Sequence, residues 1–265
     1  MPQPAPLVLV SSAMGIGSRY YRPLVEAFVA RGWSARALPR RGFEPEGARA
    51  SREHDWSYAD EVAVIAGAVA AARAEAPDRP VILLGHSLGA QLAAGHQLNH
   101  PPADGLVSVG GCLPHHRDYP MAGLPLLIQA GVIIPVLTAI FGHLPKPAFG
   151  GPGARTQMRE WARMALTGRT PFPADDLIRT PALVVALEGD RLAPEKPVRS
   201  FAARLFAPES VTVWRYGRAD VPAGASNDHT GWARTPEPVV DRIVAWWATV
   251  ENRFEEKAAP DTMRG

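Results

Sequence analysis

Short runs of apolar, mostly β-branched residues alternate with longer alanine-rich runs along most of the chain. The short runs have the length and continuity of strands buried on both faces, and the longer runs have helical spacing. Strands that alternate with helices predict βαβ units, and we expect a mostly parallel sheet of about six strands with helices on both faces. The expected strands cover residues 6–10, 33–42, 81–85, 105–111, 182–189 and 211–217, and the helices cover 18–32, 58–76, 88–100, 195–206 and 237–254.

This alternation breaks down between Cys112 and Asp176. The segment contains a long apolar stretch, a Pro/Gly-rich link and an amphipathic pattern typical of a helix at 154–168. We therefore expect one α/β core, built from residues 1–111 and 177–254, with 112–176 inserted as a cap or lid. The polar residues 255–265 are expected to form a flexible tail.

The apolar stretch at 121–142 has no charged residue and nearly the length of a membrane-spanning helix. Its prolines and glycines, and the lack of flanking Trp or Lys, argue against a span. We expect it to line an apolar pocket instead, although it could simply pack against the core. The side chains predicted to bind substrate are Leu124, Ile128, Ile133, Leu137 and Phe141; the same stretch also supplies Leu126, Leu127, Val132, Ile134 and Ile140.

Composition narrows the class of protein. The net charge is +2 and the arginines are scattered among acidic residues, so nucleic acid is not an expected partner. Cys112 is the only cysteine, which excludes an intramolecular disulfide and suits a reducing compartment. The N-terminal segment lacks the basic region of an export signal, so a cytoplasmic location is expected.

The candidate chemistry begins at residues 85–89, which read Gly-His-Ser-Leu-Gly between an expected strand and an expected helix. Reactive side chains in parallel sheets collect at the carboxyl ends of the strands, and Ser87 lies at such an end. A sharp strand-to-helix turn needs small residues beside the serine so that neighbouring backbone can pass, which explains Gly85 and Gly89. The alternative is a serine that only caps the following helix.

The chain resembles the α/β-hydrolase family at three places along most of its length. GHSLG looks like the nucleophile elbow of that family, LEGDRLAP like the turn that carries its acid, and SNDHTGW like the loop that carries its histidine. The resemblance implies a serine, acid and histidine in the order Ser87, Asp190, His229. It also implies that the antiparallel hairpin leading the family sheet is missing here.

The chemistry of the residues points to the same three side chains. A serine hydroxyl needs a base within hydrogen-bond reach, and among the eight histidines only His229 follows the last expected strand. An acid must orient the imidazole, and Asp190 ends a buried strand. Glu188, Asp228 and Asp118 are the competing acids, and His86 is expected to serve only local packing.

A tetrahedral oxyanion needs two backbone donors. The N–H of Leu88 lies at the start of a helix and is the first expected donor. The second is expected from the loop after the first strand, at Ala13 or else at Met14. Many relatives begin this loop with His-Gly, whereas this chain has Ser11-Ser12.

The favoured function is a serine hydrolase of the carboxylesterase or lipase type, acting on a small to medium apolar ester. This chemistry needs no metal or organic cofactor, and none is expected. The adjacent His115 and His116 are not expected to bind a metal, because they lack the spacing of helical metal ligands. An acyltransferase and a non-catalytic binding protein remain open as alternatives. An NADP oxidoreductase is a remote one, since Gly15-Ile16-Gly17 and Arg40-Arg41 resemble a dinucleotide site that lacks its third glycine.

Overall fold

A six-stranded sheet forms the centre of the molecule in the computed structural model, which describes residues 4–258. Every pairing in this sheet is parallel, and the strand order is β2-β1-β3-β4-β7-β8. The predicted α/β class with about six parallel strands is confirmed. The strands are β1 (Leu7–Ser11), β2 (Ser34–Ala37), β3 (Val81–His86), β4 (Gly105–Val109), β7 (Ala182–Leu187) and β8 (Val211–Tyr216).

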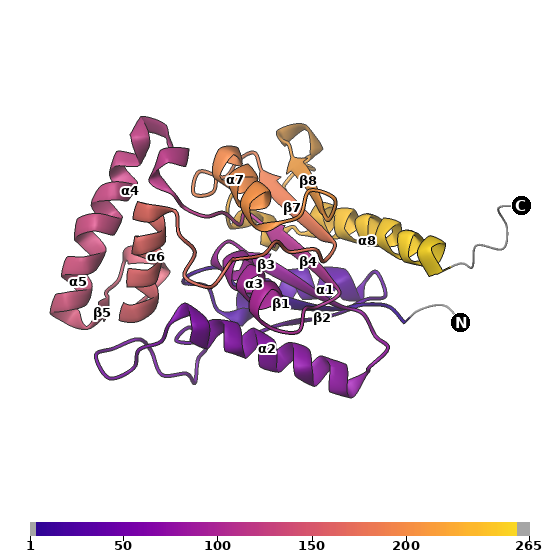
Figure 1. Ribbon diagram of the computed structural model, residues 1–265, viewed down its shortest axis with the longest axis horizontal. Helices are drawn as coiled ribbons and strands as arrows, with labels where there is room; N and C mark the ends of the chain where they lie inside the picture. The colour runs from indigo at the N-terminus through magenta and orange to yellow at the C-terminus, as the bar shows by residue number, and fades with distance from the viewer. Residues whose placement is uncertain (1–3, 259–265) are drawn as a thin grey trace, which may run out of the picture.

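Helices cover both faces of the sheet (Figure 1). Side chains alternate across a strand, so in β1 Val8 and Val10 pack toward α1 and α8, whereas Leu7 and Leu9 pack toward α2 and α3. Both hydrophobic layers are therefore built from continuous apolar strands. The helices of the core are α1 (Arg22–Val29), α2 (Tyr58–Glu75), α3 (Leu88–Asn99), α7 (Glu195–Leu205) and α8 (Glu237–Ala258).

The element boundaries depart from the predictions at a few places. Strand β2 ends at Ala37, earlier than residue 42, because Pro39 has no N–H to continue the ladder of this edge strand. Helix α1 begins at Arg22, after a short 3₁₀ turn (Ser18–Tyr21). Helix α8 continues to Ala258, so the first four residues of the predicted tail are helical; the remainder lies outside the described residues.

The segment between β4 and β7 stands beside the core, at the left of Figure 1. Here α4 (Leu124–Ile128), a π-helical turn (Gln129–Ile133) and α5 (Ile134–Phe141) follow one another directly. The strands β5 (His143–Leu144) and β6 (Gly153–Ala154) pair antiparallel and lead into α6 (Arg155–Thr167). Short 3₁₀ turns lie at His116–Asp118, Pro120–Gly123, Ala148–Gly150, Arg218–Asp220 and Gly231–Arg234.

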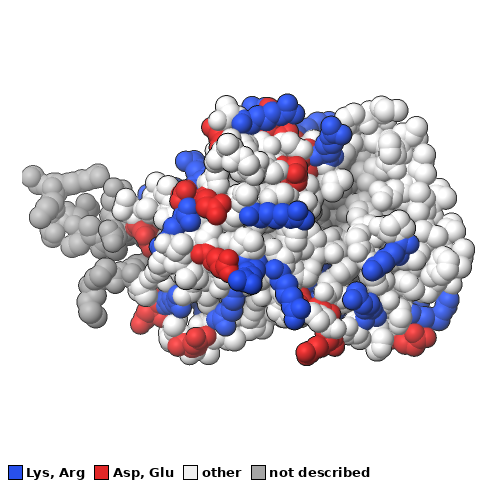
Figure 2. All heavy atoms as spheres, turned by 180° about the vertical axis from the view of Figure 1, so that it is seen from behind, with Lys and Arg blue, Asp and Glu red and all other residues white. Residues whose placement is uncertain are grey.

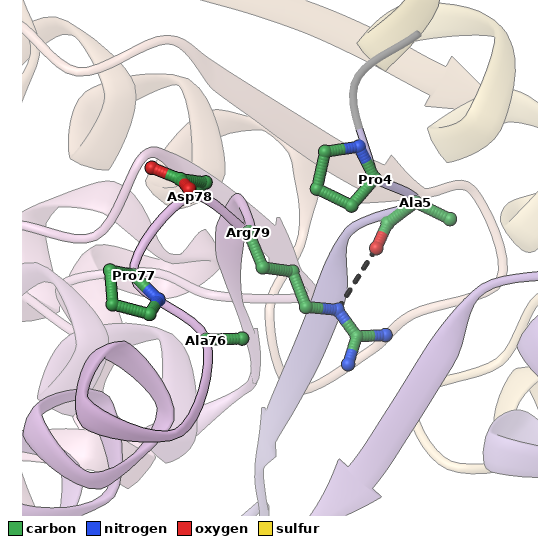
Figure 3. Close-up of a pocket in the computed structure, with 6 residues that line it drawn as sticks. All are labelled: Pro4, Ala5, Ala76, Pro77, Asp78 and Arg79. Atoms are coloured by element: carbon green, nitrogen blue, oxygen red, sulfur yellow. Dashed lines mark hydrogen bonds between the residues drawn. The ribbon is translucent and has the colours of Figure 1, made fainter. Parts of the chain in front are cut away.

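A shallow hollow lies at the amino ends of β1 and β3 (Figure 3). It is formed by Pro4 and Ala5 on one side and by the turn 76–79 on the other, and Arg79 Nε donates to the Ala5 carbonyl at 3.0 Å. Ligand sites in parallel sheets form at the opposite, carboxyl ends of the strands. We therefore assign this hollow no part in the chemistry.

A buried histidine makes the fold sensitive to acid. His96 lies on α3, where burial and then the positive charge of His100 lower its pKa from 6.5 to about 4. Between these pH values the unfolded chain binds a proton that the folded chain does not, so His96 reduces stability as the pH falls from 6.5 toward 4. We expect His96→Leu to lessen the loss of unfolding free energy between pH 7 and pH 4 by on the order of 2 kcal/mol.

Urea unfolding of wild type and variant across this pH range measures the effect. His54→Gln is the matched control, because His54 is exposed in a loop and its removal is expected to leave the pH profile unchanged. A wild-type profile retained in His96→Leu would contradict the assignment.

Candidate active site

Ser87 occupies the turn between β3 and α3 in a strained backbone conformation. Its φ of 53° and ψ of −116° are unusual for a residue with a side chain, and such strain costs about 1–3 kcal/mol. A Cβ at Gly85 would collide with the backbone of Ala90, and one at Gly89 with the carbonyl oxygen of Ser11. The turn therefore requires glycine at both flanking positions, as the sequence motif predicts.

His229 lies between Ser87 and Asp190. Its Nε2 is 2.9 Å from Ser87 Oγ, and its Nδ1 is 2.6 Å from Asp190 Oδ2. The three side chains come from loops that follow β3, β7 and β8, so the carboxyl edge of the sheet brings together residues far apart in sequence. Serine, imidazole and carboxylate form a continuous hydrogen-bonded row.

The carboxylate of Asp190 is fully buried and held from two sides. Its Oδ1 accepts the backbone N–H groups of Leu192 and Ala193, each at 2.8 Å, while Oδ2 contacts His229. Gly110 makes room for this contact at the end of β4, because a Cβ there would lie 3.0 Å from Asp190 Oδ2. Asp190 is therefore fixed in one orientation.

The three competing acids are engaged elsewhere. Glu188 pairs with Arg215 at 3.1 Å, and Asp118 pairs with Lys196 at 3.4 Å. Asp228 accepts the Ser226 hydroxyl and the N–H groups of Gly231 and Thr230 within its own loop, and these hydrogen bonds lower its pKa. Within the described part of the chain, none of these three carboxylates hydrogen-bonds to the His229 ring, whereas Asp190 does.

Backbone donors lie beside the Ser87 hydroxyl, but not all of those predicted are free. Leu88 and Met14 line the same cavity as Ser87, and among the described residues neither N–H has a hydrogen-bond partner. The N–H of Ala13 instead donates to Tyr21 Oη at 2.9 Å. The preference for Ala13 over Met14 as a donor is therefore wrong in this structure, because Tyr21 already occupies that N–H.

His86 has more than the packing role expected for it. Tyr21 Oη, which accepts the Ala13 N–H, donates to His86 Nδ1 at 2.7 Å, and His86 Nε2 donates to the His229 carbonyl at 2.6 Å. Burial, followed by the nearby His229 charge, lowers the pKa of His86 to about 3, so its ring is neutral as this pattern requires. The row ties the loop after β1 to the loop that carries His229.

A cavity of about 680 Å³ opens beside Ser87 and His229. None of the five side chains predicted to bind substrate lines it; Leu124, Ile128, Ile133 and Phe141 are exposed, and Leu137 packs against the core. That prediction is wrong because the helical segment presents a different side to the cavity. The residues of this segment that do line it include Met121, Pro125, Leu126 and Gln129.

Aromatic side chains from other parts of the insertion complete the cavity. Tyr119 lines it and donates to the Leu192 carbonyl at 2.9 Å, and Phe149 packs edge-on against Trp161 of α6. Sequence reasoning missed these residues because it followed only the longest apolar run. The amphipathic pattern of α6 places Trp161 on the buried side, and this signal could have indicated it.

Other candidate groups do not join the site's chemistry. Cys112 is buried, and burial raises the pKa of its thiol to about 12, so it stays protonated. Arg40 is buried against Glu61 at 3.4 Å and is not available to a dinucleotide phosphate. Within residues 4–258, His115 and His116 are part of no cluster of potential metal ligands.

Comparison with solved structures agrees with the architecture. A monoacylglycerol lipase of Paleococcus ferrophilus is 17% identical, with 91% of this chain and 96% of that chain covered and a TM-score of 0.57. An esterase of Exiguobacterium antarcticum is 15% identical, with 92% of each chain covered and a TM-score of 0.60. A putative non-heme bromoperoxidase, BpoC, of Mycobacterium tuberculosis is 18% identical, with 94% of each chain covered and a TM-score of 0.63. At these identities the likeness establishes the fold.

Sequence comparison adds the family. No curated protein matches the chain significantly. A family model described as serine aminopeptidase, S33, matches residues 2–144, a range that includes the Ser87 turn and ends before Asp190 and His229. Because the match spans more than half of the chain, this protein belongs to that family of α/β hydrolases.

Proposed function

We propose that this protein is a serine hydrolase that cleaves a small to medium apolar carboxylic ester. The observation that carries the proposal is the hydrogen-bonded row from Ser87 Oγ through His229 to the buried Asp190. The row lies at the mouth of a cavity, where a substrate carbonyl can reach the hydroxyl. A serine that only capped α3 would need no such partners, and its side chain makes no capping hydrogen bond.

The first half of the reaction forms an acyl-serine. Ser87 Oγ attacks the carbonyl carbon while its proton passes to His229 Nε2, and Asp190 stabilises the imidazolium that results. As the tetrahedral intermediate collapses, the bond from carbon to the leaving oxygen breaks and Nε2 returns the proton to the alcohol. In the second half, water loses a proton to His229 Nε2 and attacks the acyl carbon. The bond from that carbon to Ser87 Oγ then breaks, Nε2 returns the proton to Oγ, and the carboxylic acid leaves.

The developing oxyanion is stabilised by backbone N–H groups. Leu88 supplies one of them, at the start of α3, where the helix dipole also favours negative charge. Met14 supplies the other, since it lines the cavity and its N–H has no hydrogen-bond partner among residues 4–258. Tyr21 holds the neighbouring Ala13 N–H, which fixes the loop that presents Met14.

The cavity supports a substrate with an apolar acyl group. Its walls include Leu126, Phe149 and Trp161, so burying alkyl or aryl surface there is favourable. The polar ends of Gln91, which also lines it, are already bonded to Tyr58 and to the Cys112 carbonyl. We propose that residues 112–176 act as a cap over Ser87, and the lipase and esterase named among the similar structures support this substrate class.

A fluorophosphonate probe and a panel of esters graded by acyl length test the proposal. We expect one probe adduct on the intact protein, and kcat/KM that rises with acyl length and then falls once the chain exceeds the cavity. The released carboxylic acid is quantified in water and again with an added alcohol, which separates hydrolysis from acyl transfer.

Two outcomes would contradict the proposal. Absence of an adduct on folded protein, with a small probe as well as a large one, would favour a binding protein. Quantitative transfer of the acyl group to the alcohol would favour an acyltransferase.

A further inference from the structure

The outer side of the α4–α5 segment carries an exposed apolar row that no part of the described chain covers. Residues at intervals of four form this row, which we call the apolar stripe. Their exposed fractions lie between 48% and 59%, which is high for aliphatic side chains. The members of the apolar stripe are Leu124, Ile128, Val132, Val136 and Ile140.

The geometry of the helix keeps the stripe on one side. Steps of four residues drift around an α-helix of about 3.6 residues per turn, and the wider π-helical turn at Gln129–Ile133 offsets part of this drift. From Leu124 to Ile140 the stripe is about 25 Å long. Residues 120–142 contain no charged side chain. Figure 2 shows a broad uncharged area over this part of the molecule.

Arginines border the stripe, and we call this group the basic border: Arg52, Arg159 and Arg163. Arg52 donates to the carbonyl of Ile140 at 2.7 Å, and Arg159 donates to Thr138 of α5 at 3.2 Å. Arg163 is exposed one turn further along α6, on the same side as Arg159. Arg52 and Arg159 thus contact α5 directly, and all three arginines are exposed.

The acidic residues nearest to this border are turned to other partners. Glu160 on α6 is partly buried and accepts the Tyr58 N–H at 2.7 Å. Glu53, next to Arg52, accepts the hydroxyl of Ser51 at 2.9 Å. The border therefore presents positive charge outward, next to an apolar row.

The apolar stripe and the basic border together favour one kind of binding partner over another. A second copy of the chain would bury the stripe, but residues 120–142 offer the arginines no carboxylate to pair with. A lipid surface supplies acyl chains for the stripe and phosphates for the guanidinium groups. Positive charge beside an exposed apolar row is the pattern of helices that lie in the plane of a membrane interface.

The helical segment Pro120–Phe141, which carries the stripe, is long and apolar enough to cross a membrane by length and composition alone. Of its most apolar stretch of 18 residues, 17% are buried inside the protein. Its inner side, however, is committed to the protein. Ala130, Ile134 and Thr138 are buried, and Leu126 lines the cavity. Lipid on all sides would require this packing to be broken, whereas lipid on the outer side alone would not.

From these contacts we infer that the apolar stripe and the basic border dock the protein on an anionic lipid surface. The inference does not depend on the proposed esterase activity. It does have a consequence for that activity, because Met121 both lines the cavity and is 77% exposed beside the stripe. The cavity rim and the docking face therefore meet at this residue.

Flotation with vesicles tests the inference. We expect wild type to float with vesicles of phosphatidylcholine and phosphatidylglycerol, to float less with phosphatidylcholine alone, and to be released by salt. Val132→Glu should lower partitioning at least about tenfold, because it places a charge in the stripe. Arg159→Gln and Arg163→Gln should each lower it about fivefold.

Val29→Glu is a matched control, because Val29 and Val132 are equally exposed, at 57%, and Val29 lies on α1 in the core. The control should float like wild type, and circular dichroism establishes that all variants fold. Wild type that stays in solution, or Val132→Glu that floats unchanged, would overturn the inference. So would a dimer in sedimentation that Val132→Glu dissociates without any binding to vesicles.

Discussion

Ser87→Ala is expected to lower kcat by about 10⁶ on the best ester of the panel and to abolish the fluorophosphonate adduct. The variant keeps the turn between β3 and α3 but has no atom to form the acyl-enzyme. Residual turnover should stay above the uncatalysed rate, because the Leu88 and Met14 donors still stabilise a tetrahedral intermediate formed by water. Steady-state kinetics and intact mass measure both effects.

Ser108→Ala is the matched control for this loss. Ser108 is a fully buried serine on β4, and among the described residues its hydroxyl has no hydrogen-bond partner. We expect its activity to match wild type and the thermal unfolding of both variants to remain cooperative. An adduct that persists on Ser87→Ala would move the nucleophile to another residue.

Asp190→Asn is expected to lower kcat by about 10⁴ with little change in KM. The amide retains the shape of the buried side chain but loses the charge that stabilises the imidazolium. It can also donate to Nδ1, which would favour the tautomer whose Nε2 carries the proton and cannot accept one from Ser87. Single-turnover acylation by a chromogenic ester isolates the affected step.

Glu188→Gln serves as the control, since Glu188 pairs with Arg215 at the surface and has no contact with His229. Its kcat should remain close to wild type. If Asp190→Asn kept its turnover, the acid role would pass to Glu188 or Asp228, and the buried contact of 2.6 Å would be only structural.

The fold could be predicted because the four central strands, β1, β3, β4 and β7, are largely apolar and buried throughout, which fits a sheet covered on both faces. The strand limits were less certain where the pattern was weak. β2 is an edge strand in which no residue is fully buried, so hydrophobicity did not mark where it ends. The end is set instead by Pro39, which has no N–H to continue the ladder. The end of α8 was placed too early because a polar sequence can still be helical.

The parts of the site that depend on local sterics could be predicted from the sequence. The parts that depend on tertiary contacts could not. Gly85 and Gly89 reveal the Ser87 turn from five residues alone. The choice between Ala13 and Met14 depends on Tyr21, which reaches back across the loop to take one N–H. Likewise, an apolar run such as 121–142 does not say which side of its helix faces a cavity, because both sides are apolar here.

The row from the Ala13 N–H through Tyr21 and His86 to the His229 carbonyl joins two loops that lie far apart in sequence. His86 directly precedes Ser87, so one buried side chain connects the Ser87 turn to the loop that carries His229. We therefore expect the loop after β1 and the loop after β8 to become ordered together. A change that removes the Tyr21 hydroxyl should loosen both loops, although Tyr21 contacts only one of them through this row.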